Sequence, residues 1–490
     1  MRQLTGLDAT FLALDSPTVC SHLGCMAVLD PPARGPALTR RRLTGLIESR
    51  LHLAPPFRRR LTEVPFGFDQ PYWIEDPDFD IEFHVRELAL PAPGDDHQLA
   101  TAAARLHERP LDRNRPLWEM YLIHGLAGGR KALYTKVHHA AIDGVAGNNL
   151  LVALFDTSPQ PRTERPAVPW RPDAKPGAVQ LLARSAVSAA LQPLRLARLS
   201  AEVLRSLPAM ANSPGRPRLP VIDRFLPSRG RGVVSSAPPL IAPPTPFNKM
   251  LGPRRQCAFG SLPLETVKQI KNSAGVTVND VVMALCAGAL RTWLHDHNAL
   301  PPGPLLAAVP VSIRVEDQNA TEGNRLAKVV APLPTHLSVP GDRLRATHDA
   351  MEAAKDQVSA MPTDLFIDIA QFWLPALAKP ASRLATRMRL LERISPLNLF
   401  VSNVPGPTMD MYMGGSRLHA VYPISTIADG QGLNITVLGS RGKLNVGIVV
   451  DPELVPDVEA IMDALLRELA LLHAAVNTMT PASISASALA

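Results

Sequence analysis

The residues best suited to chemistry are two adjacent histidines, His138 and His139, in the stretch KALYTKVHHAAIDG (131–144). Asp143 and Gly144 follow the second histidine by four and five positions. An imidazole with its ordinary pKa of about 6.5 accepts a proton at neutral pH, which suits activation of a hydroxyl for attack on an acyl group. The four residues together therefore predict a general-base site for acyl transfer.

A strand that ends in a turn would place the two neighbouring histidines in different surroundings. Side chains alternate between the faces of a strand, so Val137 and His139 are predicted to share one face, and Lys136 and His138 the other. The two imidazoles then point apart and chelate a single ion poorly, and no His-Glu-x-x-His pattern is present, so we predict no metal site. His139 is the favoured base because it lies nearest the turn, where a ligand can approach.

The residues after the doublet are predicted to support it. Asp143 could pair with an arginine and fix the loop, or it could orient an imidazole, and Gly144 permits a tight backbone turn without side-chain bulk. No Gly-x-Ser-x-Gly pattern supplies a serine nucleophile, so we predict direct transfer without a covalent acyl-enzyme. The plainer alternative is one buried and one solvated histidine at a strand end. It is less favoured because Asp and Gly stand at these offsets.

The elements around the doublet predict a hairpin inside a mixed strand-and-helix region. LWEMYLIHGL (117–126) alternates like a strand, AGGRK (127–131) is a turn, and the next strand ends in the histidines. Residues 1–155 form this first region, residues 251–477 form a second one, and the tail 478–490 is predicted to be disordered. In the second region the patterns predict strands at 304–314 and 398–406, a hairpin at 432–451, and helices from near Asn279 and over 458–476.

Residues 156–250 are predicted to be a proline-rich linker that contains one basic amphipathic helix. The helical spacing covers 178–207, and Pro193 should kink or split it. Its apolar face is interleaved with four arginines, Arg184, Arg195, Arg198 and Arg205. Such a helix can lie on an anionic membrane surface. The alternative, slightly favoured, is a helix packed on the protein with its arginines in water.

Composition bounds the class of protein. The 490 residues are 46% hydrophobic and 19% charged, which predicts a sizeable packed core in two or more domains. The net charge of +7 favours anionic partners such as phosphates or a lipid surface, and with 5% aromatic residues it does not argue for nucleic acid. The four cysteines match no zinc pattern and are expected to be free thiols. The N-terminus does not resemble a signal peptide and no apolar run reaches membrane-spanning length, so we expect a cytoplasmic protein.

Longer stretches around the doublet identify a family. HHAAIDG matches the HHxxxDG motif of the coenzyme A-dependent acyltransferase superfamily, and the chain as a whole resembles the bacterial wax ester synthase/diacylglycerol acyltransferases. The resemblance covers nearly the whole chain except the proline-rich middle and the tail. The similar stretches are LTGLDATFLALDSP (4–17), RPLDRNRPLWEMYLIHGLAGGRKALYTKVHHAAIDGVAG (109–147), TVNDVVMALCAGALR (277–291), PVSIR (310–314), EGNRL (322–326), SNVPGP (402–407) and YPISTIADGQGLNITVLGSRGKLNVGIVVD (422–451).

The resemblance implies an α/β fold of two lobes, each a mixed sheet with flanking helices, and a tunnel between the lobes that leads to the histidines. It implies an acyl-CoA-dependent O-acyltransferase that makes triacylglycerol from diacylglycerol, or wax ester from a long-chain alcohol. His139 would be the general base, His138 would point into the first lobe, and Asp143 would hold the loop, with Arg314 as its suggested partner. Coenzyme A would enter only as part of the substrate, so no cofactor is expected. The enzyme would work at a membrane or lipid-inclusion surface, and the sequence does not indicate its oligomeric state.

Other matched positions carry smaller predictions. Pro116, Leu117 and Trp118 match a PLW motif, for which structural packing is the stronger interpretation. Asn279 and Asp280 match an ND motif and could contact substrate, although both residue types also start helices well. Ser402 and Asn403 end a strand and could donate hydrogen bonds to an oxyanion, or serve only the turn that follows.

The sequence departs from the family at Cys20-Ser21, where a more apolar pair is expected, and in the long middle region. These departures bear on the choice of acceptor and on membrane contact. Two further hypotheses therefore stay open. One is an enzyme of the same fold that esterifies another hydroxylated lipid, and the other is a non-catalytic protein that coats lipid surfaces.

Overall fold

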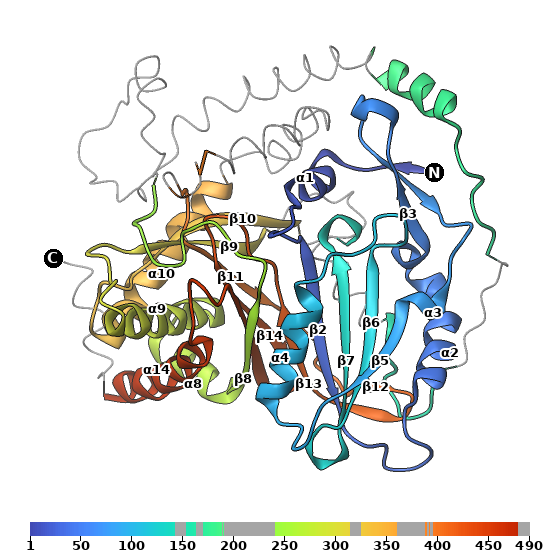
Figure 1. Cartoon of the computed structure of the whole chain (residues 1–490). Coiled ribbons are helices and arrows are strands. Elements are labelled where there is room, and N and C mark those ends of the chain that lie inside the picture. The colour runs from blue at the N-terminus through green and yellow to red at the C-terminus, as the bar shows by residue number, and fades with distance from the viewer. Residues whose placement is uncertain are drawn as a thin grey trace.

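The computed structural model describes residues 1–142, 153–162, 170–188, 190, 241–313, 325–359, 388–389, 392 and 395–478. Within these residues the strands form two six-stranded mixed sheets and one small three-stranded sheet. Figure 1 shows the two large sheets as the centres of two lobes that stand side by side. The α/β, two-lobed class predicted from the sequence is confirmed.

The first sheet carries the histidine doublet. Its strands lie in the order β12-β13-β2-β7-β6-β5 and are antiparallel except for the β5–β6 pair. Their bounds are β2 His22–Leu29, β5 Val85–Ala89, β6 Trp118–His124, β7 Lys131–His138, β12 Tyr412–Met413 and β13 Ser416–Ile424. The small sheet has the order β1-β4-β3, with β1 Arg2–Gln3, β3 Arg59–Thr62 and β4 Tyr72–Glu75.

The second sheet has the order β10-β9-β11-β14-β15-β8. The strand β11 runs parallel to both of its neighbours, and the other pairs are antiparallel. The bounds are β8 Gln256–Pro263, β9 Leu305–Ile313, β10 Arg325–Leu333, β11 Leu399–Val404, β14 Leu433–Ser440 and β15 Lys443–Val450.

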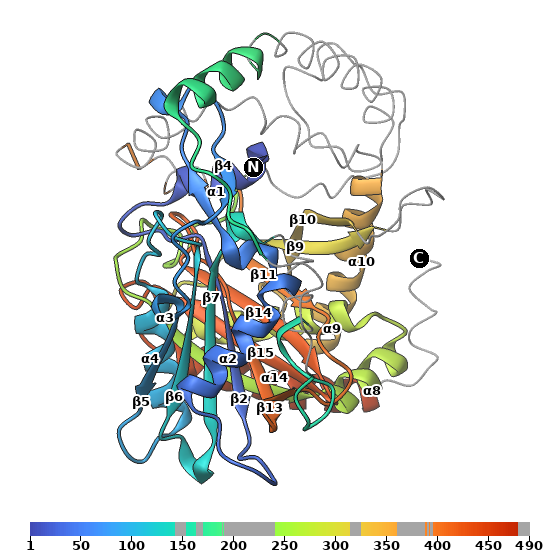
Figure 2. The ribbon, with the colours of Figure 1, turned by 90° about the vertical axis from the view of Figure 1, so that its right-hand side faces the viewer.

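Helices cover both sheets. In the first lobe α2 packs on one face of the sheet and α4 on the other, where α4 also contacts the second lobe. The largest core lies between the second sheet and α8, α9, α10 and α14, which gather on its outer side in Figures 1 and 2. The helices are α1 Gly6–Leu14, α2 Arg40–Arg50, α3 Ile81–His84, α4 Asp96–His107, α8 Leu264–Ala274, α9 Val278–Asp296, α10 Pro340–Ser359 and α14 Val458–Thr478, and the 3-10 helices are η1 Leu51–Leu53, η2 Pro55–Arg58, η3 Pro65–Gly67, η4 Ala127–Gly129 and η5 His139–Ala141.

The two lobes are joined by β12 and β13, which lie in the first sheet although the strands before and after them in the chain lie in the second. The strand β11 belongs to the second sheet, but β12 and β13, which follow it in the chain, pair into the first sheet beside β2. The chain then returns to the second sheet as β14. At this seam β13 and β15 approach so closely that a Cβ placed on Gly447 would lie 1.7 Å from the carbonyl oxygen of Pro423. The backbones of the two lobes are therefore in close contact at this seam.

The hairpins predicted from alternation are confirmed. The strands β6 and β7 pair around a turn in which Gly128 and Gly129 both have positive φ, a conformation that glycine adopts without strain. The strands β14 and β15 pair around Arg441 and Gly442, as predicted. In the described part of the chain, no single helix is both long and apolar enough to cross a membrane. The pair α8 and α9 passes that test only when taken together, and it is bent by 104°.

Candidate active site

The histidine doublet lies where β7 ends. His138 is the last residue of the strand, and His139 is the first residue of the 3-10 helix η5. The backbone N–H of His138 donates to the carbonyl of Leu117, and that of His139 donates to the carbonyl of Ser21 at 2.7 Å. The change of element between the two residues sends their side chains to different surroundings.

His138 is buried and both of its ring nitrogens are engaged. Its side chain is 2% exposed, its Nε2 lies 2.9 Å from Oδ2 of Asp15, and its Nδ1 accepts the backbone N–H of Ala140 at 3.0 Å. A carboxylate can only accept and a backbone N–H can only donate, so the proton of the neutral ring lies on Nε2. His138 therefore acts within the protein as the cap of η5 and is not placed to meet a substrate.

Asp15 is held ionised by the groups around it. Its carboxylate accepts from His138, from the backbone N–H of Ser21 at 2.9 Å and from Arg113 at 3.1 Å. Burial alone would raise the pKa of Asp15, but the hydrogen bond from His138, with further contributions from the N–H of Ser21 and the charge of Arg113, lowers that pKa to about 2. Asp15 is consequently a fixed negative charge beside the doublet.

His139 is the partly exposed member of the pair. Its ring stacks on Phe11 with the centroids 3.8 Å apart and the planes 16° from parallel. Phe11 lies on α1, which Figures 1 and 2 both place above the end of β7. Stacking against an aromatic face holds the imidazole in one orientation while part of its surface stays open.

The helix α1 is positioned by its own sequence. Thr5 caps its start by accepting the backbone N–H of Asp8, and Leu4 and Leu12 bury their side chains against Leu117 and neighbouring residues of the first lobe. The hydroxyl of Ser21 donates to the carbonyl of Phe11, which ties the end of the loop back to the helix. The segment from Thr5 to Ser21 is thus anchored at both ends against the doublet.

A buried polar network lies behind His138. His22 pairs with His138 across β2 and β7, and the two rings meet edge to face with centroids 5.8 Å apart. His107 lies 2.9 Å from the hydroxyl of Tyr134, and burial lowers the pKa of His107 to about 3. The ammonium of Lys136, fully buried, donates to two backbone carbonyls at the end of α4. These groups brace the strand that delivers the doublet.

The residues of the predicted PLW motif lie next to this strand. Leu117 supplies the carbonyl that receives the N–H of His138, and the buried Trp118 stacks on Phe57 and on His84. The indole N–H of Trp118 donates to the carbonyl of Phe57 at 2.8 Å, and Pro116 is buried as well. The contacts are those of a packed core.

Asn279 and Asn403 come together, whereas Asp280 and Ser402 lie elsewhere. The amide of Asn403 donates to the side-chain oxygen of Asn279 at 3.4 Å. Asp280 forms a capping box with Thr277 at the start of α9 and is also bonded to His348. Ser402 is adjacent to Asn403 on β11, so its side chain projects from the opposite face of the sheet. Contact of these residues with substrate or an oxyanion stays a prediction.

Three of the predicted site residues, Asp143, Gly144 and Arg314, lie outside the described residues. So do three of the four arginines of the predicted basic helix, Arg195, Arg198 and Arg205, together with Pro193. Of that helix, residues 178–188 and 190 are described and are helical, and they include Arg184.

The second lobe reaches the doublet through a loop after β13. Thr426 donates its hydroxyl to the carbonyl of Cys20 at 2.9 Å, and Asn434 of β14 donates to the carbonyl of Thr426 at 3.1 Å. Cys20 precedes Ser21, whose carbonyl holds the N–H of His139. A chain of hydrogen bonds therefore connects the second sheet with the candidate base.

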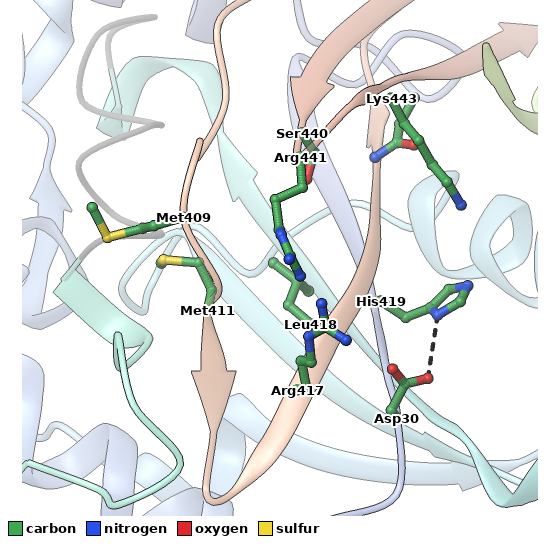
Figure 3. Close-up of a pocket in the computed structure, with 10 residues that line it drawn as sticks. Asp30, Met409, Met411, Arg417, Leu418, His419, Ser440, Arg441 and Lys443 are labelled. Atoms are coloured by element: carbon green, nitrogen blue, oxygen red, sulfur yellow. Dashed lines mark ion pairs between the residues drawn. The ribbon is translucent and has the colours of Figure 1, made fainter. Parts of the chain in front are cut away.

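A cavity of about 340 Å³ lies between the lobes at the other end of the first sheet (Figure 3). Asp30, which lines it, follows the residue of β2 that pairs with Lys131, seven positions from His138, so about 23 Å of strand separates it from the doublet. The charged side chains that line the cavity are largely paired. His419 pairs with Asp30 at 3.2 Å, and both Arg417 and Arg441 pair with Asp410. This cavity is not the candidate active site.

The residues that hold the doublet are not among those predicted from the sequence. Asp15, Phe11 and Arg113 lie within the stretches recognised as similar to the family, but no role was predicted for them. Their signal was faint, because Asp15 is simply a carboxylate that interrupts an apolar N-terminal stretch. Contacts between residues more than 100 positions apart, such as Asp15 with His138, leave no periodic pattern in a sequence.

Comparison with known proteins shows which family the chain resembles. Residues 4–282 match the model of the wax ester synthase/diacylglycerol acyltransferase catalytic domain, and residues 322–473 match the C-terminal domain of the same family. A relative from Mycobacterium tuberculosis is 37% identical over 481 residues, spanning 96% of this chain and 90% of the relative. Another from that species is 35% identical and spans 96% of this chain and 98% of the relative. Both are provisionally named diacylglycerol O-acyltransferases.

Solved structures show the same architecture. The wax ester synthase/diacylglycerol acyltransferase from Marinobacter aquaeolei VT8 aligns over 97% of this chain and 100% of its own, with a TM-score of 0.69 and 28% identity. The first condensation domain of a calcium-dependent antibiotic synthetase aligns over 98% of this chain and 99% of its own, with a TM-score of 0.53 and 19% identity. The second likeness shows a shared fold alone.

Proposed function

The chain belongs to the wax ester synthase/diacylglycerol acyltransferase family, and we propose that His139 is the general base with which it esterifies diacylglycerol or a long-chain alcohol. Membership makes the protein an acyl-CoA-dependent acyltransferase, as the resemblance implied. The proposal adds the base, the route of transfer and the acceptor. Coenzyme A enters only as part of the donor.

The choice of His139 as the base rests on the different surroundings of the two histidines. His138 is buried and uses both ring nitrogens inside the protein, whereas His139 is partly exposed and held by Phe11. A general base must reach the proton that it abstracts, so His139 is the member of the pair that can serve.

The reaction then proceeds in two steps within one complex. His139 takes the proton of the acceptor hydroxyl as its oxygen attacks the carbonyl carbon of the acyl thioester. The tetrahedral intermediate collapses, the carbon–sulfur bond breaks, and the imidazolium of His139 returns the proton to the sulfur of coenzyme A. The ester and free coenzyme A are the products, and no covalent bond to the protein is formed. Donor and acceptor would approach the histidine through a tunnel between the lobes.

Ester formation by the purified protein tests this function. The donor is palmitoyl-CoA, and the acceptors are dioleoylglycerol and hexadecanol in separate reactions. Triacylglycerol or wax ester formed at a rate proportional to enzyme supports the proposal, and the ratio of the two products identifies the preferred acceptor. Folded protein that forms neither ester would replace this acceptor class with another hydroxylated lipid. Intact-protein mass spectrometry with palmitoyl-CoA alone tests the route, because an added palmitoyl group on the protein would contradict direct transfer.

Work at a lipid surface is part of the proposal because both acceptors are insoluble in water. The positive net charge and the helical residues 178–188, which expose Val179 and Val187, support it. The test is flotation with vesicles of phosphatidylglycerol and phosphatidylcholine. The variant changes Arg184, Arg195, Arg198 and Arg205 together to glutamate. Unchanged flotation of the variant would remove this helix from the surface role.

A further inference from the structure

We propose that Asp15 is a positioning residue of the active site, which fixes the tautomer of His138 and through it the turn that presents His139. The inference rests on the proposed function, since it assumes that His139 is the base. Asp15 touches neither substrate nor the reacting proton in this scheme. Its effect passes through His138 and the backbone of η5.

Asp15 determines which ring nitrogen of His138 carries the proton. Oδ2 of Asp15 lies 2.9 Å from Nε2 of His138, and an ionised carboxylate has no proton to donate. Nε2 must therefore carry the proton, and Nδ1 keeps its lone pair. Arg113 and the N–H of Ser21 bind the same carboxylate and hold it in this orientation.

The tautomer of His138 in turn determines whether its side chain can cap η5. The lone pair of Nδ1 accepts the backbone N–H of Ala140 at 3.0 Å, which makes the His138 side chain the N-terminal cap of the 3-10 helix that begins at His139. With the proton on Nδ1 instead, two donors would face each other and the cap would be lost. The backbone angles of His139 are set by this turn, so the orientation of its imidazole depends on the tautomer of its neighbour.

Asp15 is also linked to the ring of His139 through Phe11, which belongs to the same segment of the chain. Phe11, which stacks on His139, lies one helical turn before Asp15 at the end of α1. Arg113 donates both to Asp15 and to the carbonyl of Leu12 between them. One segment thus holds the buried histidine with a carboxylate and the exposed histidine with an aromatic ring.

Replacement of Asp15 by asparagine tests the inference, because the amide keeps the size and removes the charge. One orientation of the amide points its NH₂ at the N–H of Ser21, and the other points it at Nε2 of His138 and favours the wrong tautomer. We expect Asp15→Asn to lower kcat by on the order of 10- to 100-fold, as a misplaced catalytic group does, and to leave the KM for palmitoyl-CoA within about twofold.

The matched control is Asp30→Asn. Asp30 also pairs with a histidine, His419 at 3.2 Å, at the far end of the same strand β2, as the dashed line in Figure 3 shows. This variant should keep kcat within about twofold. His139→Ala is measured beside both. If His139→Ala is inactive and folded Asp15→Asn keeps the wild-type kcat, the positioning role is wrong while the proposed base stands. If His139→Ala stays active, the proposed function itself fails.

A second measurement covers the case in which Asp15→Asn does not fold. The ¹⁵N shifts of the His138 ring in histidine-labelled wild-type protein report which nitrogen carries the proton. A protonated Nε2 with an unprotonated Nδ1 supports the inference. A protonated Nδ1 overturns it, whatever the variant does.

Discussion

Two further histidines of the first lobe, His84 and His107, are buried. Burial lowers the pKa of His84 to about 4, although the carbonyl of Trp118 partly opposes the change, and burial with the charge of Lys136 lowers the pKa of His107 to about 3. In the unfolded chain the pKa of each histidine returns to about 6.5. The unfolded state therefore binds more protons than the folded state between these values.

The free energy of unfolding should fall as the pH falls below about 6.5, and the loss should be complete near pH 4 for His84 and near pH 3 for His107. Between pH 7 and pH 5, each of these two histidines lowers the free energy of unfolding by about 2 kcal/mol. Urea unfolding of His84→Gln at the two pH values should show a pH dependence smaller by about that amount. Equal pH dependence in the variant and in wild type would contradict the burial argument.

At the scale of residues, the sequence indicated the candidate base but not the residues that hold it. The HHxxxDG pattern and the alternation of the strand were enough to predict that His138 and His139 differ in surroundings. The partners Asp15 and Phe11 became visible only in the fold, since α1 reaches the doublet from the start of the chain. Side-chain contacts of this kind depend on tertiary packing, which no local pattern encodes.

At the scale of elements, the N-terminus of α9 shows how a family motif can have a structural role. Asp280 accepts the N–H of Thr277, Thr277 accepts the N–H of Asp280, and His348 of α10 binds the same carboxylate. This arrangement satisfies N–H groups that the first turn of a helix leaves without partners. It also ties α9 to α10 across the core of the second lobe.

Asp280→Ala should lower the free energy of unfolding by about 2 kcal/mol, because a cap and a bond to His348 are lost together. If Asp280 is structural, the KM for either substrate in the remaining folded protein stays within about twofold. The control is Glu265→Ala, since Glu265 is an exposed carboxylate in the first turn of the neighbouring helix α8. A large rise in KM without loss of stability would instead assign Asp280 to substrate binding.

Elements with a clear period were predictable and those defined by distant pairing were not. The hairpins β6–β7 and β14–β15 and the helix α14 follow from alternation and helical spacing in single stretches of sequence. The strand β13 was not predicted as part of the first sheet. Its partner β2 lies almost 400 residues earlier in the chain, and its register is set by that contact.

At the scale of the whole molecule, the seam between the lobes determines how the second sheet meets the site. The strand β13 belongs to the first sheet and β15 to the second, and the two approach closely at Gly447. No side chain fits there, because even a Cβ would overlap the carbonyl of Pro423. The loop with Thr426, which supports the segment that holds His139, follows directly after β13.

Gly447→Ala should force the two strands apart and destabilise the protein by on the order of 1–3 kcal/mol, and it should lower kcat as the lobes shift. Gly439→Ala is the matched control on the same hairpin, because a Cβ there meets no atom closer than 3.8 Å. Denaturant midpoints and kcat measured together check the prediction. A Gly447→Ala protein as stable and active as Gly439→Ala would show that the seam is not tight.

His139 is proposed to perform the proton transfer of acyl-CoA-dependent ester formation. The measurement that tests it most directly is kcat for ester formation from palmitoyl-CoA by wild type, His139→Ala and His124→Ala, with the preferred acceptor. His124 is the control because it is also a partly exposed histidine of the hairpin, at the end of β6 away from the doublet.

We predict that His139→Ala loses ester formation by on the order of 10²- to 10⁴-fold, the usual contribution of a positioned general base, while His124→Ala stays within about twofold of wild type. The melting temperature of each variant confirms that folded proteins are compared. Ester formation by His139→Ala at the wild-type rate would contradict the mechanism and would require another group to take the proton from the acceptor.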